Sequence, residues 1–293
     1  MSLEIVEWAG QTDNALAVCS EKNNHESGNA NFAESAMTIG VFDGVHLGHQ
    51  ELIRKIVQRG PNPTIVTFRE NPKKHVSRST FEGDLYSLKQ KLTVFERLGV
   101  CRVLLIDFSE NFSKLSGRDF LDLLTSRGKM VYLAIGKNFR CGWRKDTDAA
   151  VIEEINRLKG IPTEVIAPVV LPPAYGAGPV SSSRIRSAIF SGDLKLAAAL
   201  IGRNFDLDLS DITPVESGCC LSPTADTGVD REKLKNLVFD PGTVNRIIPG
   251  NGRYNVLLYP GRRECQADIE GGKVFLRELP ALTRAESLEF IIN

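Results

Sequence analysis

Apolar residues recur in short blocks along residues 37–202, and polar or glycine-containing stretches separate the blocks. Short continuous apolar runs are typical of buried strands, whereas apolar residues three and four positions apart indicate amphipathic helices. By these criteria the sequence predicts strands at residues 3–8, 15–19, 37–42, 63–68, 101–108, 130–136 and 162–170. It predicts helices at residues 51–60, 85–99, 116–128 and 148–160, and two short helices within residues 181–202.

The order of these elements predicts the fold class. Strands that alternate with helices are typical of an α/β fold with a doubly wound parallel sheet, in which ligands bind beyond the carboxyl ends of the strands. After Asn204 the pattern changes to short alternating runs, which predict strands at residues 253–259, 264–270 and 273–279. We therefore predict an α/β domain at residues 1–204 and a smaller β-rich domain at residues 205–293.

Composition and charge exclude several classes of protein. The chain has 36 Lys+Arg and 36 Asp+Glu residues, so it lacks the basic excess that a dedicated nucleic-acid binder usually carries. Its six cysteines have no C-x-x-C spacing, which indicates reduced thiols and no zinc site. No apolar run reaches the ~18 residues of a membrane helix, and the N-terminus has no basic region typical of a secretory leader. We expect a cytoplasmic protein with neither a nucleic acid nor a membrane as partner.

The segment GVFDGVHLGH, residues 40–49, links a predicted buried strand to a predicted helix. Its glycines allow close approach of the backbone to a ligand, and a helix N-terminus favours phosphate. His46 and His49 are three residues apart and share one face of the helix, where imidazoles can donate hydrogen bonds to phosphate oxygens. An H-x-x-H pair in a turn is often only two surface histidines, but the strand, glycines and helix in register favour a nucleotide site.

Two further segments carry candidate ligand groups. SSSRIR, residues 181–186, begins a predicted helix, where serines are ordinary caps. Serine hydroxyls with an arginine also suit the outer phosphates of a nucleotide. Arg184 and Arg186 do not share a helical face, so one can point at a ligand while the other faces solvent or a neighbouring helix. IGKNFRCGWR, residues 135–144, follows a predicted strand and is a weak signal by itself.

Together these segments resemble one family. TIGVFDGVHLGHQ is similar to the nucleotidylyl-transferase signature of the prokaryotic bifunctional riboflavin kinase/FAD synthetases, which are FMN adenylyltransferases. IGKNFRCG matches the family's G-x-D/N-F-R-F-G motif, and SSSRIRSAIFSGDLKLAAALIGRNF resembles its S-S-T-x-I-R segment and the following hinge. The resemblance covers residues 37 to about 206 and implies a Rossmann-like nucleotidylyl-transferase fold. It implies that Mg²⁺ and ATP convert FMN into FAD with release of pyrophosphate.

The resemblance also implies roles for individual residues. A phosphate is a competent nucleophile at neutral pH, so catalysis would consist of positioning and charge neutralisation. The implied catalytic residues, which would act on the ATP phosphates and the transition state, are His46, His49 and Arg186. The implied ATP-binding residues are Gly40, Phe42, Asp43, Gly44, Gly48, Ser182 and Ser183. The implied flavin-binding residues are Phe68, Asn71 and Asn138.

Two departures from the family pattern affect the acceptor. Glu70-Asn71-Pro72 stands where the family has P-H-P, and Cys141 replaces an aromatic residue. The acceptor is therefore FMN or another small phosphorylated or amine substrate. The non-enzyme alternative is a nucleotide- or flavin-binding regulatory protein, against which the intact His46, His49 and Arg186 argue.

The C-terminal region resembles part of the family's kinase module, a β-barrel, which implies a barrel-like domain at residues 205–293. Ser222-Pro223-Thr224-Ala225-Asp226 is similar to its P-T-A-N motif, which makes Thr224 and Asp226 a possible kinase relic. Only 39 residues follow Tyr254. A hydroxyl nucleophile benefits from a general base, and the sequence pattern selects neither Glu264 nor Glu270 for that role. We expect a reduced β-domain that packs on or regulates the first domain, and a bifunctional enzyme is the alternative.

Overall fold

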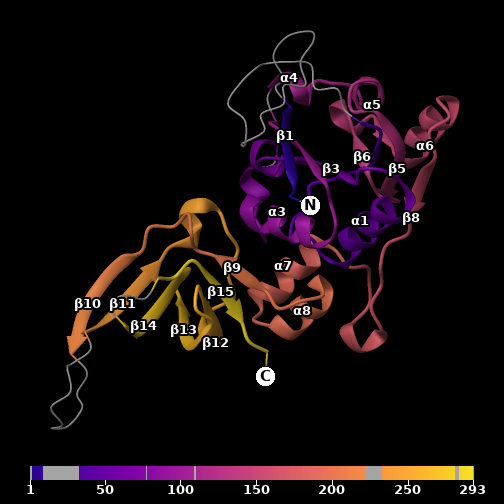
Figure 1. Ribbon diagram of the computed structural model, residues 1–293. Coiled ribbons are helices and arrows are strands. Elements are labelled where there is room, and N and C mark those ends of the chain that lie inside the picture. Colours follow the sequence, from indigo (N-terminus) through magenta and orange to yellow (C-terminus); the bar gives the residue numbers. More distant parts are fainter. Residues whose placement is uncertain are drawn as a thin grey trace, which may run out of the picture. The chain divides into compact units, whose positions relative to one another are not determined.

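The computed structural model describes residues 2–8, 33–76, 78–108, 110–221, 233–280 and 284–292 (Figure 1). Packing divides the chain into two compact units. The first unit consists of Met1–Phe81 with Leu88–Val170, and the second of Glu82–Ser87 with Leu171–Asn293. Residues 171–204 thus group with the second unit, which differs from the domain boundary that we predict near residue 204. That boundary stays a prediction, because the units are defined by packing alone.

The first unit is built on a six-stranded sheet whose strand order is β1-β4-β3-β2-β5-β8. Every pair in it is parallel, which confirms the predicted α/β fold with a parallel sheet. The strands are β1 (Glu4–Trp8), β2 (Ser35–Ile39), β3 (Thr64–Phe68), β4 (Arg102–Ile106), β5 (Met130–Gly136) and β8 (Thr163–Ile166). β2 is buried along its whole length, as expected for a parallel strand covered on both faces. Beside this sheet, β6 (Arg140–Cys141) and β7 (Thr147–Asp148) form a small hairpin.

Helices cover both faces of this sheet. They are α1 (Leu47–Arg59), α2 (Lys73–Val76), α3 (Leu88–Arg97), α4 (Glu110–Ser113), α5 (Gly117–Ser126) and α6 (Ala149–Leu158), with the short 3-10 turns η1 (Arg78–Thr80) and η2 (Trp143–Lys145). Successive side chains of a strand point to opposite faces. Leu133 and Ile135 of β5 belong to the core cluster that α5 and α6 complete, whereas Tyr132 donates a hydrogen bond to Glu164, which pairs with Lys55 of α1. The sheet is therefore doubly wound.

The ends of several elements differ from the prediction. β2 ends at Ile39 because the backbone at Phe42 and Val45 has positive φ values, which no strand adopts. α1 begins four residues earlier than predicted, at Leu47, because His46 supplies its N-cap. The strand predicted at residues 15–19 lies outside the described residues.

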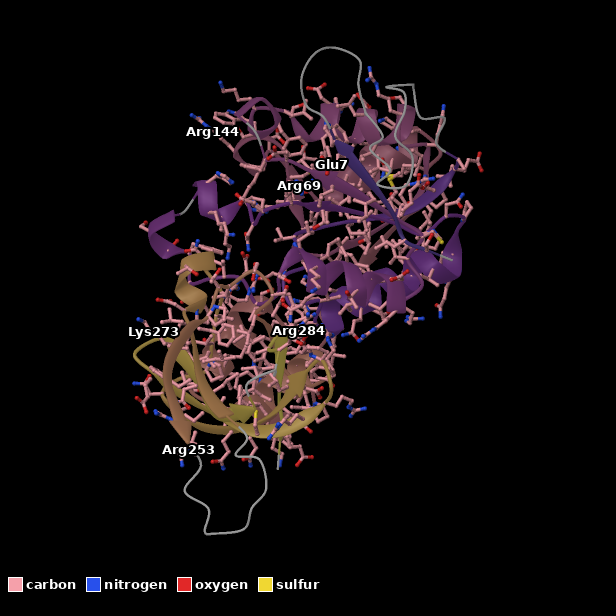
Figure 2. The ribbon with its side chains drawn as sticks, turned by 60° about the vertical axis from the view of Figure 1, so that its left-hand side comes forward. Glu7, Arg69, Arg144, Arg253, Lys273 and Arg284 are labelled. Carbon is pink, nitrogen blue, oxygen red and sulfur yellow. The ribbon has the colours of Figure 1, made fainter. Side chains whose placement is uncertain are left out.

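Ion pairs join neighbouring parts of the first unit. Arg69, which follows β3, pairs with Glu7 of β1, and Figure 2 shows the two side chains close together. Since β4 lies between β1 and β3 in the sheet, this pair spans three strands near their carboxyl ends. Within the described residues, no helix has the length and apolar content that crossing a membrane requires.

The second unit contains a seven-stranded antiparallel sheet with the order β10-β11-β14-β13-β12-β15-β9. Its strands are β9 (Asp206–Asp208), β10 (Val215–Leu221), β11 (Lys233–Phe239), β12 (Gly252–Tyr259), β13 (Arg263–Glu270), β14 (Lys273–Pro280) and β15 (Ser287–Phe290). It also holds the helices α7 (Ser182–Phe190) and α8 (Leu194–Ile201), and the turns η3 (Pro173–Tyr175) and η4 (Pro241–Val244). The predicted β-rich C-terminal region is thereby confirmed.

Residues 82–87, which we call the docked segment, belong to the second unit although the residues on both sides of them belong to the first. Leu85 and Tyr86 of this segment are buried, with 0% and 2% of their surface exposed. The Tyr86 hydroxyl donates a hydrogen bond to Asp206 and accepts one from Arg203. Ser87 donates to Asp208. The docked segment explains why the helix predicted from residue 85 begins only at Leu88.

Candidate active site

The sheet of the first unit has its topological switch point between β2 and β5. From β2 the chain continues to β3 on one side, whereas β5 pairs with the other side of β2. In doubly wound sheets, ligands bind beyond the carboxyl ends of the strands at such a point. The loop after β2 is residues 40–46 and the turn after β5 includes Asn138, so two of the three predicted motifs meet here.

Residues 40–46, which we call the β2 loop, have a strained backbone. Phe42 and Val45 adopt φ values of 53° and 37°, in the left-handed region that β-branched and bulky residues rarely enter. Both side chains are fully buried, and the amide of Val45 donates to the carbonyl of Phe42. Such strain costs about 1–3 kcal/mol per residue and persists only where the surroundings enforce it, which is most common at functional sites.

The two predicted histidines lie against each other at the start of α1. Their rings are stacked with centroids 3.6 Å apart, and the edge of Phe42 packs on His49 at 5.1 Å. Nδ1 of His46 accepts a hydrogen bond from the backbone amide of His49 over 3.4 Å, so a neutral His46 carries its proton on Nε2. His46 thus caps the helix through its Nδ1 atom.

The surroundings of His49 favour its neutral form. Burial, together with the charges of His46 and Lys91, holds the pKa of His49 well below its ordinary value. Among the described residues, Nδ1 of His49 is buried and has no hydrogen-bond partner. A neutral His49 at the positive end of a helix dipole can donate a hydrogen bond to an anion without titrating near neutral pH.

The predicted flavin-binding residues flank the β2 loop. Phe68 ends β3 on one side of β2, and its ring packs on Phe108 and Phe112 with centroids 5.8 and 6.0 Å apart. Asn71 is buried, and its side-chain oxygen accepts from the backbone amide of Lys73 at the start of α2. Asn138 is exposed in the turn after β5, on the other side of β2.

Cys141, which replaces an aromatic residue of the family motif, contacts the apolar core below this edge of the sheet. Burial, with the nearby carboxylate of Asp146, raises the pKa of the Cys141 thiol to about 12. The thiol stays protonated at neutral pH and acts as a small apolar group, not as a nucleophile.

The predicted phosphate ligands of the second unit lie at the start of α7. Ser181 caps this helix by accepting from the amide of Arg184, and Ser182 and Ser183 form its first turn. The guanidinium of Arg184 donates to carbonyls of the preceding loop, at Tyr175, Gly176 and Gly178.

Arg186 instead is buried, and its Nε donates to the carbonyl of Gly83 over 2.9 Å. The two arginines therefore do face different surroundings, as their spacing predicts. Their ligand roles stay predictions. Thr224 and Asp226, the possible kinase relic, lie outside the described residues.

Sequence reasoning missed Lys91, a lysine of α3 with only 5% of its surface exposed. Its charge acts on His49. The sequence could have indicated this burial, because Lys91 lies four residues before Phe95 and thus on the apolar face of an amphipathic helix.

Residues 29–184 match the family model of FAD synthetase. The curated relatives include three proteins named bifunctional riboflavin kinase/FMN adenylyltransferase. That of Buchnera aphidicola subsp. Acyrthosiphon pisum is 29% identical over 182 residues, which are 60% of this chain and 56% of the relative. That of Escherichia coli K12 is 27% identical over 202 residues, which are 67% of this chain and 63% of the relative. That of Bacillus subtilis 168 is 29% identical over 209 residues, which are 69% of this chain and 64% of the relative. The chain thus spans 56–64% of the length of these relatives.

One solved structure matches most of the chain. It is described as a macrolide-efflux protein from Streptococcus pneumoniae, and it superimposes with a TM-score of 0.66 at 21% identity, covering 89% of this chain and 86% of that one. At this identity the likeness shows a shared fold alone. The match to the family model is different in kind, because it extends over more than half of the residues and includes the β2 loop and both histidines. On that ground the chain belongs to the FAD synthetase family.

Proposed function

We propose that this chain is an FMN adenylyltransferase that transfers AMP from MgATP to FMN and releases FAD and pyrophosphate. The observation that carries the proposal is the stacked pair of His46 and His49 at the N-terminus of α1. This pair lies beyond β2 at the switch point of the sheet, inside the residues that match the FAD synthetase model. An ATP-consuming reaction of this kind fits the cytoplasmic location that we expect.

The proposed reaction is a displacement at phosphorus. A phosphate oxygen of FMN attacks the α-phosphorus of ATP, and the bond from that phosphorus to the oxygen of the β-phosphate breaks. The pyrophosphate leaves with the electron pair of that bond. A phosphate monoester with a second pKa of about 6 is already ionised at neutral pH, so the enzyme needs no strong base and acts by positioning and charge stabilisation.

Residues of the first unit suit this task. In our proposal, Nε2–H of His46 and an N–H of the neutral His49 donate to the transferring phosphate, and the first-turn amides of α1 hold the same group. Gly40, Phe42, Asp43, Gly44 and Gly48 shape the adenosine and phosphate pocket. We treat Mg²⁺ as part of the substrate MgATP, because the ion binds chiefly to nucleotide phosphates and takes one or two protein carboxylates.

The remaining predicted residues complete the proposal. Ser182, Ser183 and Arg186 hold the outer phosphates of ATP, and Phe68, Asn71 and Asn138 form the flavin side. We propose transferase activity alone, without riboflavin kinase activity. The bifunctional names of the relatives and the antiparallel sheet of the second unit keep the kinase as the second candidate, which the same experiment tests.

The experiment uses the full chain with MgATP and either FMN or riboflavin, and resolves the flavin products by chromatography. We expect FAD and pyrophosphate from FMN, and no FMN from riboflavin. An ATP analogue with a methylene bridge between the β- and γ-phosphates separates the two chemistries. It still permits adenylyl transfer, because that reaction breaks the α–β linkage, but it cannot donate a γ-phosphate.

Two results would change the proposal. The absence of FAD from FMN with either nucleotide would overturn adenylyl transfer to this acceptor. Formation of FMN from riboflavin with ATP, but not with the analogue, would establish the kinase that we propose to be absent. An analogue bridged between the α- and β-phosphates is the matched control, and it should give no FAD.

A further inference from the structure

Lys91 of α3 is a lysine in an unusual place. Only 5% of its surface is exposed, and lysines are almost never buried unless a counter-charge or a functional role accounts for them. The neighbouring lysine of the same helix, Lys89, is exposed as expected for a surface helix. Burial therefore distinguishes Lys91 from Lys89 within two residues.

The packing of α3 places Lys91 beside the histidine pair. Phe95 lies one turn further along the same face of α3, and its ring meets Phe42 of the β2 loop edge-on with centroids 5.7 Å apart. Phe42 in turn packs on His49 at 5.1 Å. The charge of Lys91 also contributes to the low pKa of His49. Three observations thus place the buried ammonium near the N-terminus of α1.

The candidate site needs more positive charge than His49 and the N-terminus of α1 supply, and the ammonium of Lys91 can provide it. His49 is neutral near pH 7, and the N-terminus of α1 supplies only about half an elementary charge. The phosphates of a nucleoside triphosphate bring several negative charges into the same place, and a bound Mg²⁺ neutralises only part of them. Within the described part of the first unit, Lys91 is the buried residue that can supply a full positive charge there.

We propose that Lys91 is a phosphate-binding residue of the candidate site, and that its ammonium donates to the phosphates of a nucleotide held at the N-terminus of α1. The inference deepens the proposed function and rests on it in taking that nucleotide to be MgATP. The competing role is structural. Asp43 of the β2 loop is also buried, and a lysine that only balanced a buried acid would stabilise the fold without affecting nucleotide affinity.

The test measures MgATP binding to the full chain by calorimetry, without FMN, for the wild type and for K91M, K91R and K89M. We expect K91M to bind MgATP about 10- to 100-fold more weakly, the range for losing a hydrogen bond to a charged group. K91R should restore part of the affinity, because it keeps the charge. K89M should bind like the wild type, because it removes an equal charge from the exposed face of the same helix.

Thermal unfolding of each variant separates the two roles. Wild-type affinity in K91M combined with a lower melting temperature would overturn the proposal and establish the structural role. If K91M does not fold, K91Q keeps a polar end group without the charge and is judged by the same two measurements.

The two proposals fail separately. Binding of MgATP that depends on Lys91, without FAD formed from FMN, would leave this inference standing and overturn the acceptor. FAD formation from FMN, combined with a K91M variant that binds MgATP as tightly as the wild type, would overturn the role of Lys91 and leave the proposed acceptor standing. A wild type that binds no MgATP would overturn both.

Discussion

His49 makes the stability of the first unit depend on pH. In the folded chain its pKa lies well below the ordinary value of 6.5, because of burial and the charges of His46 and Lys91. In the unfolded chain the pKa returns to about 6.5, so below that pH the unfolded chain binds one more proton than the folded chain. The free energy of unfolding is therefore highest above pH 6.5, and it falls as the pH drops from 6.5 toward the folded pKa.

The size of this effect follows from proton linkage. A proton bound only by the unfolded chain lowers the free energy of unfolding by about RT ln(1 + 10^(6.5 − pH)). Between pH 7.5 and pH 5.5 this term grows by about 1.4 kcal/mol. His49→Gln keeps a polar side chain but removes the titration. The wild type should therefore lose about 1.4 kcal/mol more than H49Q over this pH range.

Urea unfolding followed by tryptophan fluorescence measures this difference in the stability of the first unit, because both tryptophans, Trp8 and Trp143, belong to that unit. An equal loss of stability in the wild type and H49Q would refute the claim that the surroundings hold His49 neutral.

Three further substitutions test other parts of the structure. His46→Gln should lower kcat for FAD formation about 100- to 1000-fold, the effect of removing one donor to the transition state; steady-state kinetics would contradict this role if kcat were unchanged. Gly44→Ala puts a Cβ on a residue with a φ of 76° and should cost about 1–2 kcal/mol, which an unchanged thermal melting temperature would disprove. Tyr86→Phe leaves Asp206 and Arg203 without their shared hydroxyl and should cost about 1–3 kcal/mol; circular dichroism of urea unfolding detects the loss, and wild-type stability would argue against it.

The sequence predicts elements well where local patterns decide them. The runs at residues 63–68, 101–108 and 130–136 became β3, β4 and β5, because a buried parallel strand is apolar on both faces. The start of α1 was missed by four residues. Its cap is His46, a residue type that is not among the usual N-cap residues.

The candidate site was predictable only in part. The three-residue spacing of His46 and His49 places both rings on one turn of a helix, so their meeting at α1 could be read from the sequence. The pairing of β2 with β5, which sets the switch point, depends on contacts between residues about a hundred positions apart in the chain. The position of Lys91 beside the histidines required the same kind of information, because Phe42 and Phe95, which pack α3 against the β2 loop, are distant in sequence.

The docked segment imposes an order on folding. Its partners, which include Arg186, Arg203, Asp206, Asp208 and Asn245, are synthesised more than a hundred residues after it in most cases. During translation, the Tyr86 hydroxyl therefore cannot bond to Arg203 and Asp206 until both residues have been synthesised, whereas the strands of the first unit are complete at residue 166. A chain cut at residue 170 would lack Arg203 and Asp206 and the hydrogen bonds that the Tyr86 hydroxyl makes with them, so an isolated first unit should replace the docked segment by a new connection from Phe81 to Leu88.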